Sequence, residues 1–302
     1  MTRMHADEVS TDAGLVGRLL AAQFPHWAGL PVERVHSAGT DNALYRLGDD
    51  MVVRLPRIDW AVGGVENAHE WLPRLAPLLP VAVPVPLARG TPALGYPWPW
   101  SVYPWLEGEN PTVDRLDHPE LLAGDLALFV DALRRVDLAG GPPAGRGVPL
   151  VERDEPTRTA IAALRGMVDT DAVTEAWEAA LRTPAWSGPS VWVHGDLAPG
   201  NLLLRDGRLA AVIDFGGVGV GDPACDLMVA WNLLPPDTRG VFRTALGVDD
   251  ATWNRGRGWA LTVALLQLPY YKDTNPPLAA SSRHVIREVL ADHNGTYVSL
   301  TT

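Results

Sequence analysis

The sequence has very little cysteine and no long run of apolar residues. Its 302 residues include one cysteine, Cys225, which cannot form an intrachain disulfide. No stretch of about 18 or more apolar residues is present, which argues against a membrane-spanning helix. Residues 1–20 are amphipathic and lack the apolar segment and small-residue cleavage site of a signal peptide. Together these absences predict a cytoplasmic protein.

Positive charge is also scarce. The formal net charge is −11 at pH 7, and Lys272 is the only lysine. A nucleic-acid-binding protein needs a basic surface to replace the counterions of the phosphate backbone, so we expect no nucleic-acid partner. An acidic balance suits a cationic substrate, although many proteins are acidic only for solubility. We expect no membrane association and no obligate protein partner.

The sequence is rich enough in apolar residues, at 47%, to form the core of one large domain or two modest ones. Before Gly108, short strand-like segments are joined by tight turns, which is typical of an antiparallel sheet rather than of βαβ units. These segments span residues 32–37, 42–48, 51–56 and 98–108. Apolar residues at helical spacing predict helices at residues 9–24 and 64–78.

After Gly108 the sequence changes to helical patterns, interrupted by a Gly/Pro-rich loop at residues 139–149. Helices are predicted at residues 118–137, 157–182, 224–233, 238–247 and 251–269. We therefore predict an α+β fold with two lobes. Residues 1–104 would form a small lobe with an N-terminal helix, an antiparallel sheet and one further helix, and residues 105–302 a larger, mainly helical lobe.

Polar side chains follow two apolar strands late in the sequence, in VWVHGDLAPGN (191–201) and in VIDFGG (212–217). The ends of these strands would bring Asp196, Asn201 and Asp214 to one place. Carboxylate and amide oxygens suit a hard cation such as Mg²⁺, which prefers to share its ligands with substrate phosphates. A carboxylate that does not bind the metal can orient a hydroxyl and accept its proton. These are the components of phosphoryl transfer, although a single aspartate at a strand end is more often a turn residue.

The combined spacing is more specific than any single residue. Asp196 and Asn201 reproduce the D-x-x-x-x-N spacing of a kinase catalytic loop, and residues 214–216 supply D-F-G. The segments VHGDLAPGN and VIDFGGVGVGDPACDL resemble the signature of the aminoglycoside phosphotransferase (APH)-like family of small-molecule kinases. The resemblance runs from about residue 30 almost to the C-terminus and is strongest at residues 191–233.

This resemblance implies a bilobal protein-kinase-like fold. It also implies that ATP or GTP binds between the lobes and gives its γ-phosphoryl group to a substrate hydroxyl, with Mg²⁺ as cofactor. Asp196 would be the catalytic base, and Asn201 and Asp214 would bind the metal. His194 and Asp226 would support the catalytic loop structurally.

The nucleotide would lie against the small lobe. The segment HSAGTDNALYRL (36–47) occupies the place of the turn that covers the phosphates, and its backbone N–H groups could contact phosphate oxygens. The segment YPWLEG (103–108) occupies the place of the adenine-binding hinge. The nucleotide-binding residues that the resemblance implies in these two segments are Ser37, Gly39, Thr40, Asn42, Tyr103 and Trp105.

Kinases also place a basic residue on the strand that follows the phosphate-covering turn. The resemblance assigns this role to Arg54, whose fork of N–H donors suits phosphate oxygens. In kinases a helix glutamate pairs with this residue, but Ala68 occupies the matching position here. Glu66 and Glu70 lie two residues to either side, a rotation of about 200° along a helix. Arg54 would then pair with Asp214 or with phosphate alone.

The acceptor would contact the mainly helical lobe. The segment LPYYKDTNPP (268–277) is the best candidate for a substrate loop, with Tyr270, Tyr271 and Asp273 as contacts for a sugar or an amine. Other acidic side chains could meet a cationic acceptor, although charged helix faces are usually only solvated. These are Asp154, Glu155, Asp169 and Asp171.

Several functions remain open at this point. The leading one is a magnesium-dependent kinase of an aminoglycoside or another antibiotic. One alternative is a metabolic kinase that acts on choline, homoserine or a sugar-like molecule. Ala68 suggests another, a catalytically impaired nucleotide-binding relative. A protein kinase is disfavoured because Asp222 follows Asp214 too closely for a long activation segment, and no A-P-E follows.

Overall fold

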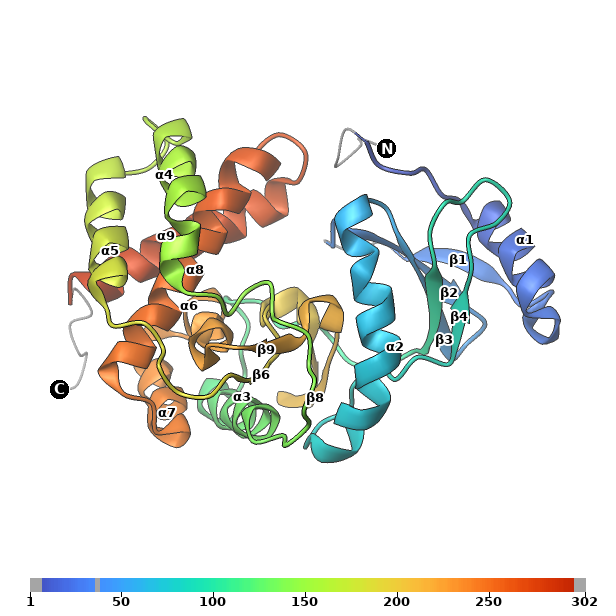
Figure 1. The fold of residues 1–302 in the computed structure, drawn as a ribbon, viewed down its shortest axis with the longest axis horizontal. Helices are drawn as coiled ribbons and strands as arrows, with labels where there is room; N and C mark the ends of the chain where they lie inside the picture. The colour runs from blue at the N-terminus through green and yellow to red at the C-terminus, as the bar shows by residue number, and fades with distance from the viewer. Residues whose placement is uncertain (1–6, 36–38, 296–302) are drawn as a thin grey trace.

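The computed structural model describes residues 7–35 and 39–295. Its N-terminal and C-terminal parts lie side by side as two lobes, with the sheet in one lobe and most of the helices in the other (Figure 1). This arrangement confirms the predicted α+β fold. The division between residues 104 and 105 stays a prediction.

The described part of the small lobe contains a five-stranded antiparallel sheet with strand order β1-β2-β3-β5-β4. Side chains alternate along the strands, so that Ala43, Tyr45 and Leu47 all lie on the buried face. This face packs against α1, which begins where the Asp12 side chain accepts a hydrogen bond from Leu15 N at 2.7 Å. The elements are α1 (Ala13–Gln23), β1 (Val32–Val35), β2 (Asn42–Leu47), β3 (Met51–Pro56), β4 (Ala88–Gly90) and β5 (Trp100–Pro104).

Helix α2 (Gly63–Leu75) packs mainly against the other lobe. In the described residues most buried apolar side chains fall into two clusters, one between the sheet and α1 and a larger one centred in the helical lobe. The buried side chains Ala68, Trp71 and Leu72 of α2 belong to the larger cluster. The Trp71 ring lies 4.8 Å from that of Trp192, measured between centroids. Helix α2 therefore connects the small lobe to the core of the large one.

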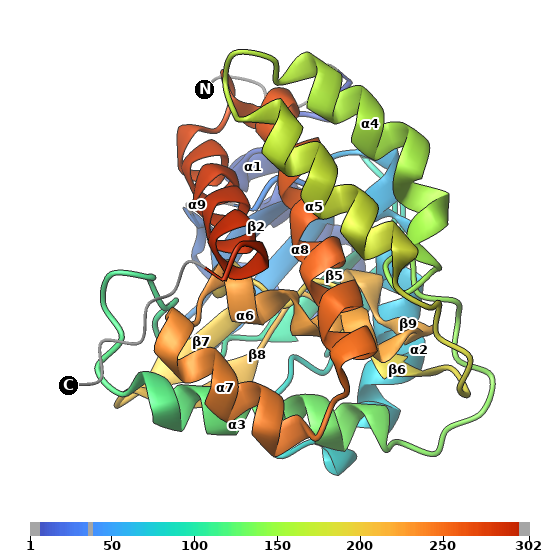
Figure 2. The same cartoon turned by 90° about the vertical axis from the view of Figure 1, so that its left-hand side faces the viewer.

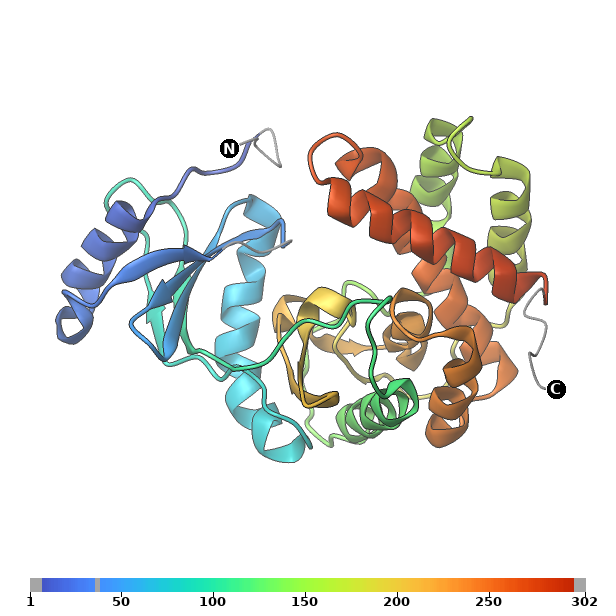
Figure 3. The same cartoon turned by 180° about the vertical axis from the view of Figure 1, so that it is seen from behind.

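The large lobe is built around α8 (Asp250–Tyr271), which has helices on several sides (Figure 2). Residues 105–118 cross from the end of β5 to the first of these helices, α3 (Figure 3). Two short antiparallel pairs, β6 with β9 and β7 with β8, lie in this lobe on the side of the sheet. The remaining elements are α3 (Pro119–Arg134), α4 (Asp154–Ala163), α5 (Thr170–Arg182), β6 (Val191–Val193), β7 (Leu202–Arg205), β8 (Arg208–Val212), β9 (Gly219–Gly221), α6 (Val229–Asn232), α7 (Pro236–Leu246) and α9 (Pro276–His293).

The prediction of one continuous helix at residues 157–182 is wrong. The chain forms α4 and α5 with a break between them, because Gly166 adopts a left-handed conformation with φ +81° and Asp169 caps the second helix. The Asp169 side chain accepts from Ala172 N at 3.0 Å. The segment predicted as a helix at 224–233 is a 3₁₀ turn, Pro223–Met228, followed by the short α6. Neither β4 nor α9 was predicted.

Within residues 7–35 and 39–295, no helix combines the length and the apolar character needed to cross a bilayer.

Candidate active site

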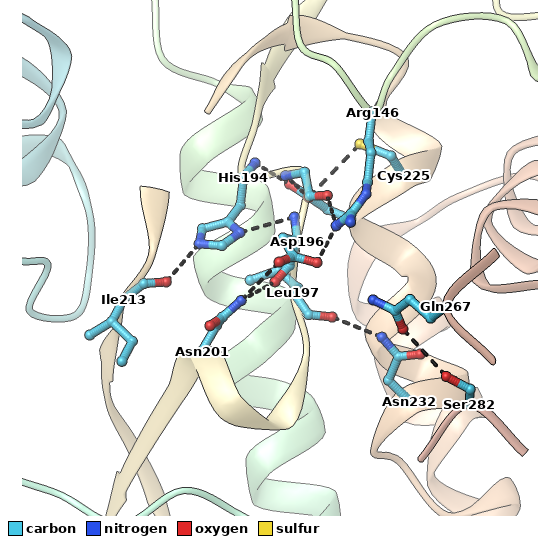
Figure 4. Close-up of polar contacts among 12 residues, drawn as sticks. Arg146, His194, Asp196, Leu197, Asn201, Ile213, Cys225, Asn232, Gln267 and Ser282 are labelled. Carbon is cyan, nitrogen blue, oxygen red and sulfur yellow. Dashed lines mark hydrogen bonds and ion pairs between the residues drawn. The ribbon is translucent and has the colours of Figure 1, made fainter. Parts of the chain in front are cut away.

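The loop that follows β6 is closed by its own polar side chains. Asn201 Nδ2 donates to the Asp196 backbone oxygen at 2.8 Å and to Asp196 Oδ2 at 3.2 Å (Figure 4). The amide nitrogen of Asn201 thus faces Asp196, and its oxygen is the atom oriented away from the carboxylate. The two residues lie together as their spacing predicted.

A buried carboxylate holds the start of this loop. Asp226, in the 3₁₀ turn Pro223–Met228, accepts from the backbone N–H groups of His194 at 2.8 Å and Gly195 at 2.7 Å. Its side chain is almost fully buried, and this desolvation raises the pKa of Asp226 even though both N–H groups favour the carboxylate. Asp226 therefore fixes the point at which the chain leaves β6.

His194 joins the loop to the neighbouring strand. Asp196 N–H donates to His194 Nδ1 at 3.1 Å, so the proton of the neutral ring lies on Nε2. Nε2 lies 3.0 Å from the Ile213 backbone oxygen, to which it donates. Ile213 N in turn donates to Asn201 O at 2.9 Å. These contacts bring the residue that precedes Asp214 against the loop that carries Asp196.

Two asparagines hold the loop from other elements. Asn110, in the connection between the lobes, donates from Nδ2 to Gly200 O at 3.1 Å and to Leu202 O at 2.8 Å. Asn232 at the end of α6 donates to Leu197 O at 3.1 Å (Figure 4). Neither residue was predicted from the sequence, because both lie more than 30 positions from the loop they support.

Asp214 follows β8 and forms an ion pair with the small lobe. It has left-handed backbone angles, with φ +61°, which aspartate tolerates better than most residues. Arg54 Nη2 donates to Asp214 Oδ1. Burial alone would raise the pKa of Asp214, but the charge and the hydrogen bond of Arg54, together with weaker contributions from neighbouring groups, lower it overall. Pairing of Arg54 with Asp214 was one of the two expected alternatives.

The position of Ala68 explains why helix α2 does not supply this carboxylate. Ala68 is buried in the apolar core, whereas Glu66 is exposed and pairs with Arg89 at 2.7 Å. Arg54 is instead held within the sheet by Asn42, whose amide oxygen, turned toward the guanidinium, accepts from Nη2 at 2.8 Å and Nε at 3.2 Å. Asp214 therefore takes the place of the helix glutamate as the partner of Arg54.

Helix α2 also contacts the D-F-G turn closely. A Cβ at Gly64 would lie 3.0 Å from the Gly216 Cα, so glycine at position 64 allows the two backbones to approach. Phe215 is buried against the His194 ring, with 4.6 Å between ring centroids. The turn is thus fixed on both sides.

The predicted phosphate-covering turn reaches the large lobe. Ser37 lies outside the described residues. Thr40 Oγ1 donates to Asp41 Oδ1 at 2.8 Å and accepts from Tyr271 Oη at 3.1 Å. Gly39 directly precedes Thr40. The structure therefore brings a predicted nucleotide residue and a predicted acceptor residue together.

The predicted hinge residues lie in two different environments. Tyr103 on β5 is buried and lines a small cavity with Arg54 and Asn42. Trp105 is the first residue after β5, and the Arg46 guanidinium lies over its ring at 4.0 Å from the centroid. One face of the Trp105 ring is therefore already covered.

A surface cavity of about 620 Å³, widely open to solvent, lies between α4 and α8, and of the three predicted acceptor residues Tyr270 lines it. Tyr271, the last residue of α8, contacts Thr40 as described above, and Asp273 is exposed beside Lys272. The cavity lining is mostly apolar and includes one acid. It consists of Glu155, Pro156, Thr159, Ala160, Ala163, Leu266, Pro269 and Tyr270.

Two of the other acidic candidates have structural partners. Asp154 accepts from Arg158 Nε at 2.8 Å and from Trp177 Nε1 at 2.9 Å. Asp169 caps α5, as described above. Of the four acids named from the sequence outside the substrate loop, Glu155 is the one that lines the cavity.

The described residues contain no group of three or more His, Cys, Asp or Glu side chains that could hold a metal ion. Asn201 and Asp214 offer a smaller set, one amide oxygen and one carboxylate. Such a set suits Mg²⁺, which usually binds one or two protein oxygens and completes its shell with water and phosphate oxygens. The donor chemistry therefore fits magnesium together with a nucleotide.

Residues 32–259 match the family described as APH, the phosphotransferase enzyme family. This match covers most of the chain. The chain belongs to this family. The resemblance inferred from residues 191–233 is thereby confirmed.

Curated relatives match a shorter part of the chain. Aminoglycoside 3'-phosphotransferases of Escherichia coli and Salmonella typhimurium are each 31% identical over 86 residues. The aligned part is 28% of this chain and 32% of each relative, so the chain matches about a third of their length.

Solved structures of an aminoglycoside and a macrolide phosphotransferase share the fold over most of the chain. The GDP complex of wild-type aminoglycoside 2'-phosphotransferase-IIIa superposes with a TM-score of 0.73 at 19% identity, covering 94% of this chain and 100% of that one. Macrolide 2'-phosphotransferase from Brachybacterium faecium has a TM-score of 0.61 at 24% identity, covering 91% and 97%. These likenesses confirm the predicted kinase-like fold.

Proposed function

We propose that the chain transfers the γ-phosphoryl group of ATP or GTP to a hydroxyl of a small molecule, with Mg²⁺ as cofactor. The observation that carries the proposal is the hydrogen bonding of Asp196 with Asn201 in one loop, to which the residue before Asp214 is joined by the Ile213–Asn201 backbone hydrogen bond. Family membership and relatives solved with GDP, or with GDP and kanamycin, support it.

The residues divide the work according to their contacts. Asp196 orients the acceptor hydroxyl and accepts its proton. Asn201 and Asp214 hold Mg²⁺, which when bound supplies positive charge to the phosphate oxygens. Arg54 stays ionised and presents its guanidinium to the nucleotide phosphates from the small lobe. His194 and Asp226 keep the catalytic loop in place through the backbone contacts described above.

The nucleotide lies between the lobes, where the turn at 39–42 covers the phosphates. Tyr103 and Trp105 lie beside the purine base of the nucleotide. The Thr40–Tyr271 hydrogen bond joins this turn to the end of α8, next to the cavity that Tyr270 lines. The acceptor therefore enters from the α4–α8 side.

The lining of this cavity favours one acceptor class. A polycationic aminoglycoside needs several acids, whereas the cavity offers Glu155 and an otherwise mainly apolar wall. A hydroxylated antibiotic with an apolar face and a single amine fits better. Such molecules include macrolides, the substrates named for two of the structural neighbours.

A turnover screen tests the function. ATP and GTP are offered in parallel, with Mg²⁺, to macrolides, aminoglycosides, choline, homoserine and sugars. Saturable phosphorylation of a macrolide-type acceptor supports the whole proposal. Phosphorylation of another acceptor overturns only the acceptor class. Nucleotide binding without turnover of any acceptor points to the catalytically impaired alternative that Ala68 suggested.

The metal assignment is tested by Asp214→Asn. We expect Mg²⁺–nucleotide affinity to fall at least about 10-fold, because the variant loses a charged metal ligand. Titration calorimetry with and without Mg²⁺ separates this effect from loss of the Arg54 contact, since only the metal-dependent part of the affinity should disappear. An unchanged magnesium dependence would place the metal elsewhere.

The acceptor cavity is tested by filling it. Thr159→Trp on the exposed face of α4 should raise the acceptor KM at least about 10-fold while the nucleotide KM stays constant, because the indole occupies the acceptor volume. Ala162→Trp is the matched control, since Ala162 is exposed on the same helix but does not line the cavity. Equal kinetics for both variants would exclude this cavity as the acceptor site.

A further inference from the structure

The catalytic carboxylate has a second partner that the sequence did not reveal. Arg146 Nη1 donates to Asp196 Oδ1 and, at 3.1 Å, to the Gly195 backbone oxygen (Figure 4). The other carboxylate oxygen, Oδ2, accepts from Asn201 Nδ2 at 3.2 Å. Each oxygen of Asp196 is therefore held by a donor from a different segment, which fixes the plane of the carboxylate.

The loop that carries Arg146 is itself anchored by backbone hydrogen bonds on both sides of this residue. Val220 N donates to Pro142 O at 2.8 Å, and Ala144 N donates to Val220 O at 3.0 Å. On the far side, Asp222 N donates to Gly147 O at 2.8 Å. The Gly/Pro-rich segment at 139–149 thus lies along β9 and delivers Arg146 at a defined place.

Two glycines of the GVGVGD segment make this seating possible. A Cβ at Gly219 would lie 2.5 Å from Pro142 O, and a Cβ at Gly221 would lie 2.7 Å from Gly147 O. Real side chains do not approach a backbone oxygen so closely, so any other residue would displace the loop. The alternating glycines after the D-F-G turn therefore serve the loop that positions Arg146.

The Arg146–Asp196 ion pair should contribute little to the stability of the fold. The side chains of Arg146 and Asp196 are 33% and 40% exposed, and partly solvated pairs stabilise proteins weakly. Asp196 raises the pKa of the Arg146 guanidinium, which stays protonated and can act only as a donor. Its position on the carboxylate that must meet the acceptor hydroxyl indicates a role in alignment.

We infer that Arg146 is a positioning residue, which holds the Asp196 carboxylate in the orientation that receives the acceptor hydroxyl. The inference rests on the proposed function. Misalignment of a reacting group by about 1 Å can slow an enzyme about 100-fold without affecting binding. Loss of Arg146 should therefore lower kcat and leave the KM values nearly unchanged.

Kinetics of Arg146→Ala, Arg146→Lys and the control Arg135→Ala test the inference. Arg135, the C-cap residue of α3, also pairs with an aspartate, Asp131, at 2.8 Å, but in an exposed contact within one helix. We expect Arg146→Ala to lower kcat about 10- to 100-fold with both KM values within about 3-fold. Added guanidinium should restore part of this rate, Arg146→Lys should keep part of it, and Arg135→Ala should match the wild type.

The outcomes separate this inference from the proposed function. If the wild type phosphorylates an acceptor and Asp196→Asn does not, the function stands. Given that result, an unchanged kcat in Arg146→Ala overturns the role of Arg146. The role of Arg146 is also overturned if added guanidinium does not restore the lost rate, or if Arg146→Ala lowers the melting temperature together with the rate. Either result would indicate a purely structural contact. If no acceptor is turned over, the proposed function itself fails first.

Discussion

Asp196→Asn should lower kcat by about 10²–10⁴-fold and leave nucleotide affinity nearly unchanged. The amide has almost the shape of the carboxylate, and its oxygen can still accept from Arg146. The variant loses the 3.2 Å contact with Asn201 Nδ2, but Asn201 keeps its 2.8 Å hydrogen bond to the backbone oxygen of residue 196, so the loop should keep its geometry. It cannot accept the proton of the acceptor hydroxyl. The loss therefore isolates the chemical role of Asp196 from its structural contacts.

The measurement combines steady-state kinetics with the acceptor and calorimetric titration of Mg²⁺–nucleotide. Asp206→Asn is the matched control, because Asp206 lies in the exposed turn between β7 and β8 with φ +52°, a conformation that asparagine also adopts. The control should keep wild-type values in both measurements. An equal loss of rate and nucleotide affinity in Asp196→Asn would show that this residue acts through binding rather than as the base.

The largest expected loss of stability follows from Asp222→Ala. Asp222 and Arg255 are both about 95% buried, with Arg255 Nε 2.7 Å from Asp222 Oδ2. Asp222 also accepts from Ala224 N at 2.9 Å, which caps the 3₁₀ turn that carries Asp226. Removal of the carboxylate leaves a buried, unpaired guanidinium, which costs about 3–5 kcal/mol of the free energy of unfolding.

Urea denaturation measures this change directly. Asp250→Ala is the control, since its side chain is 89% exposed and its pair with Arg243 should contribute no more than about 1 kcal/mol. Adding Arg255→Met to Asp222→Ala should recover part of the loss, because it removes the unpaired buried charge. Similar losses in Asp222→Ala and Asp250→Ala would contradict the buried-pair argument.

The residues of the kinase signature lie close together in the sequence, which is why the centre of the candidate site could be predicted without the structure. Asp196 and Asn201 are five residues apart, and Asp214 follows the next strand pair, so local hairpin geometry alone brings them close. The antiparallel order of β2 and β3 was predictable for the same reason, since the short segment 48–50 joins these strands. The β-rich small lobe and the helical large lobe followed from the change in apolar periodicity near residue 108.

Helix boundaries were less well predicted where a cap residue interrupts an apolar pattern. The pattern at 157–182 continues across Gly166 and Asp169, and the structure shows that a left-handed glycine and an N-cap aspartate end one helix and begin the next. Both residues were present in the sequence as breaking signals. The apolar periodicity continues through both residues, so by itself it predicts a single helix.

By itself the sequence determined the family and the two-lobed α+β fold, and it proposed the trio Asp196, Asn201 and Asp214, because these depend on local patterns and short spacings. The tertiary structure alone decided the partners that come from distant positions. Asp214 pairs with Arg54 across 160 residues, and Arg146 reaches Asp196 from 50 residues upstream. Thr40 meets Tyr271 across 231 residues, and two helices far apart in sequence line the open pocket that we propose for the acceptor. Such contacts depend on how the lobes and loops pack, which no spacing along the chain encodes.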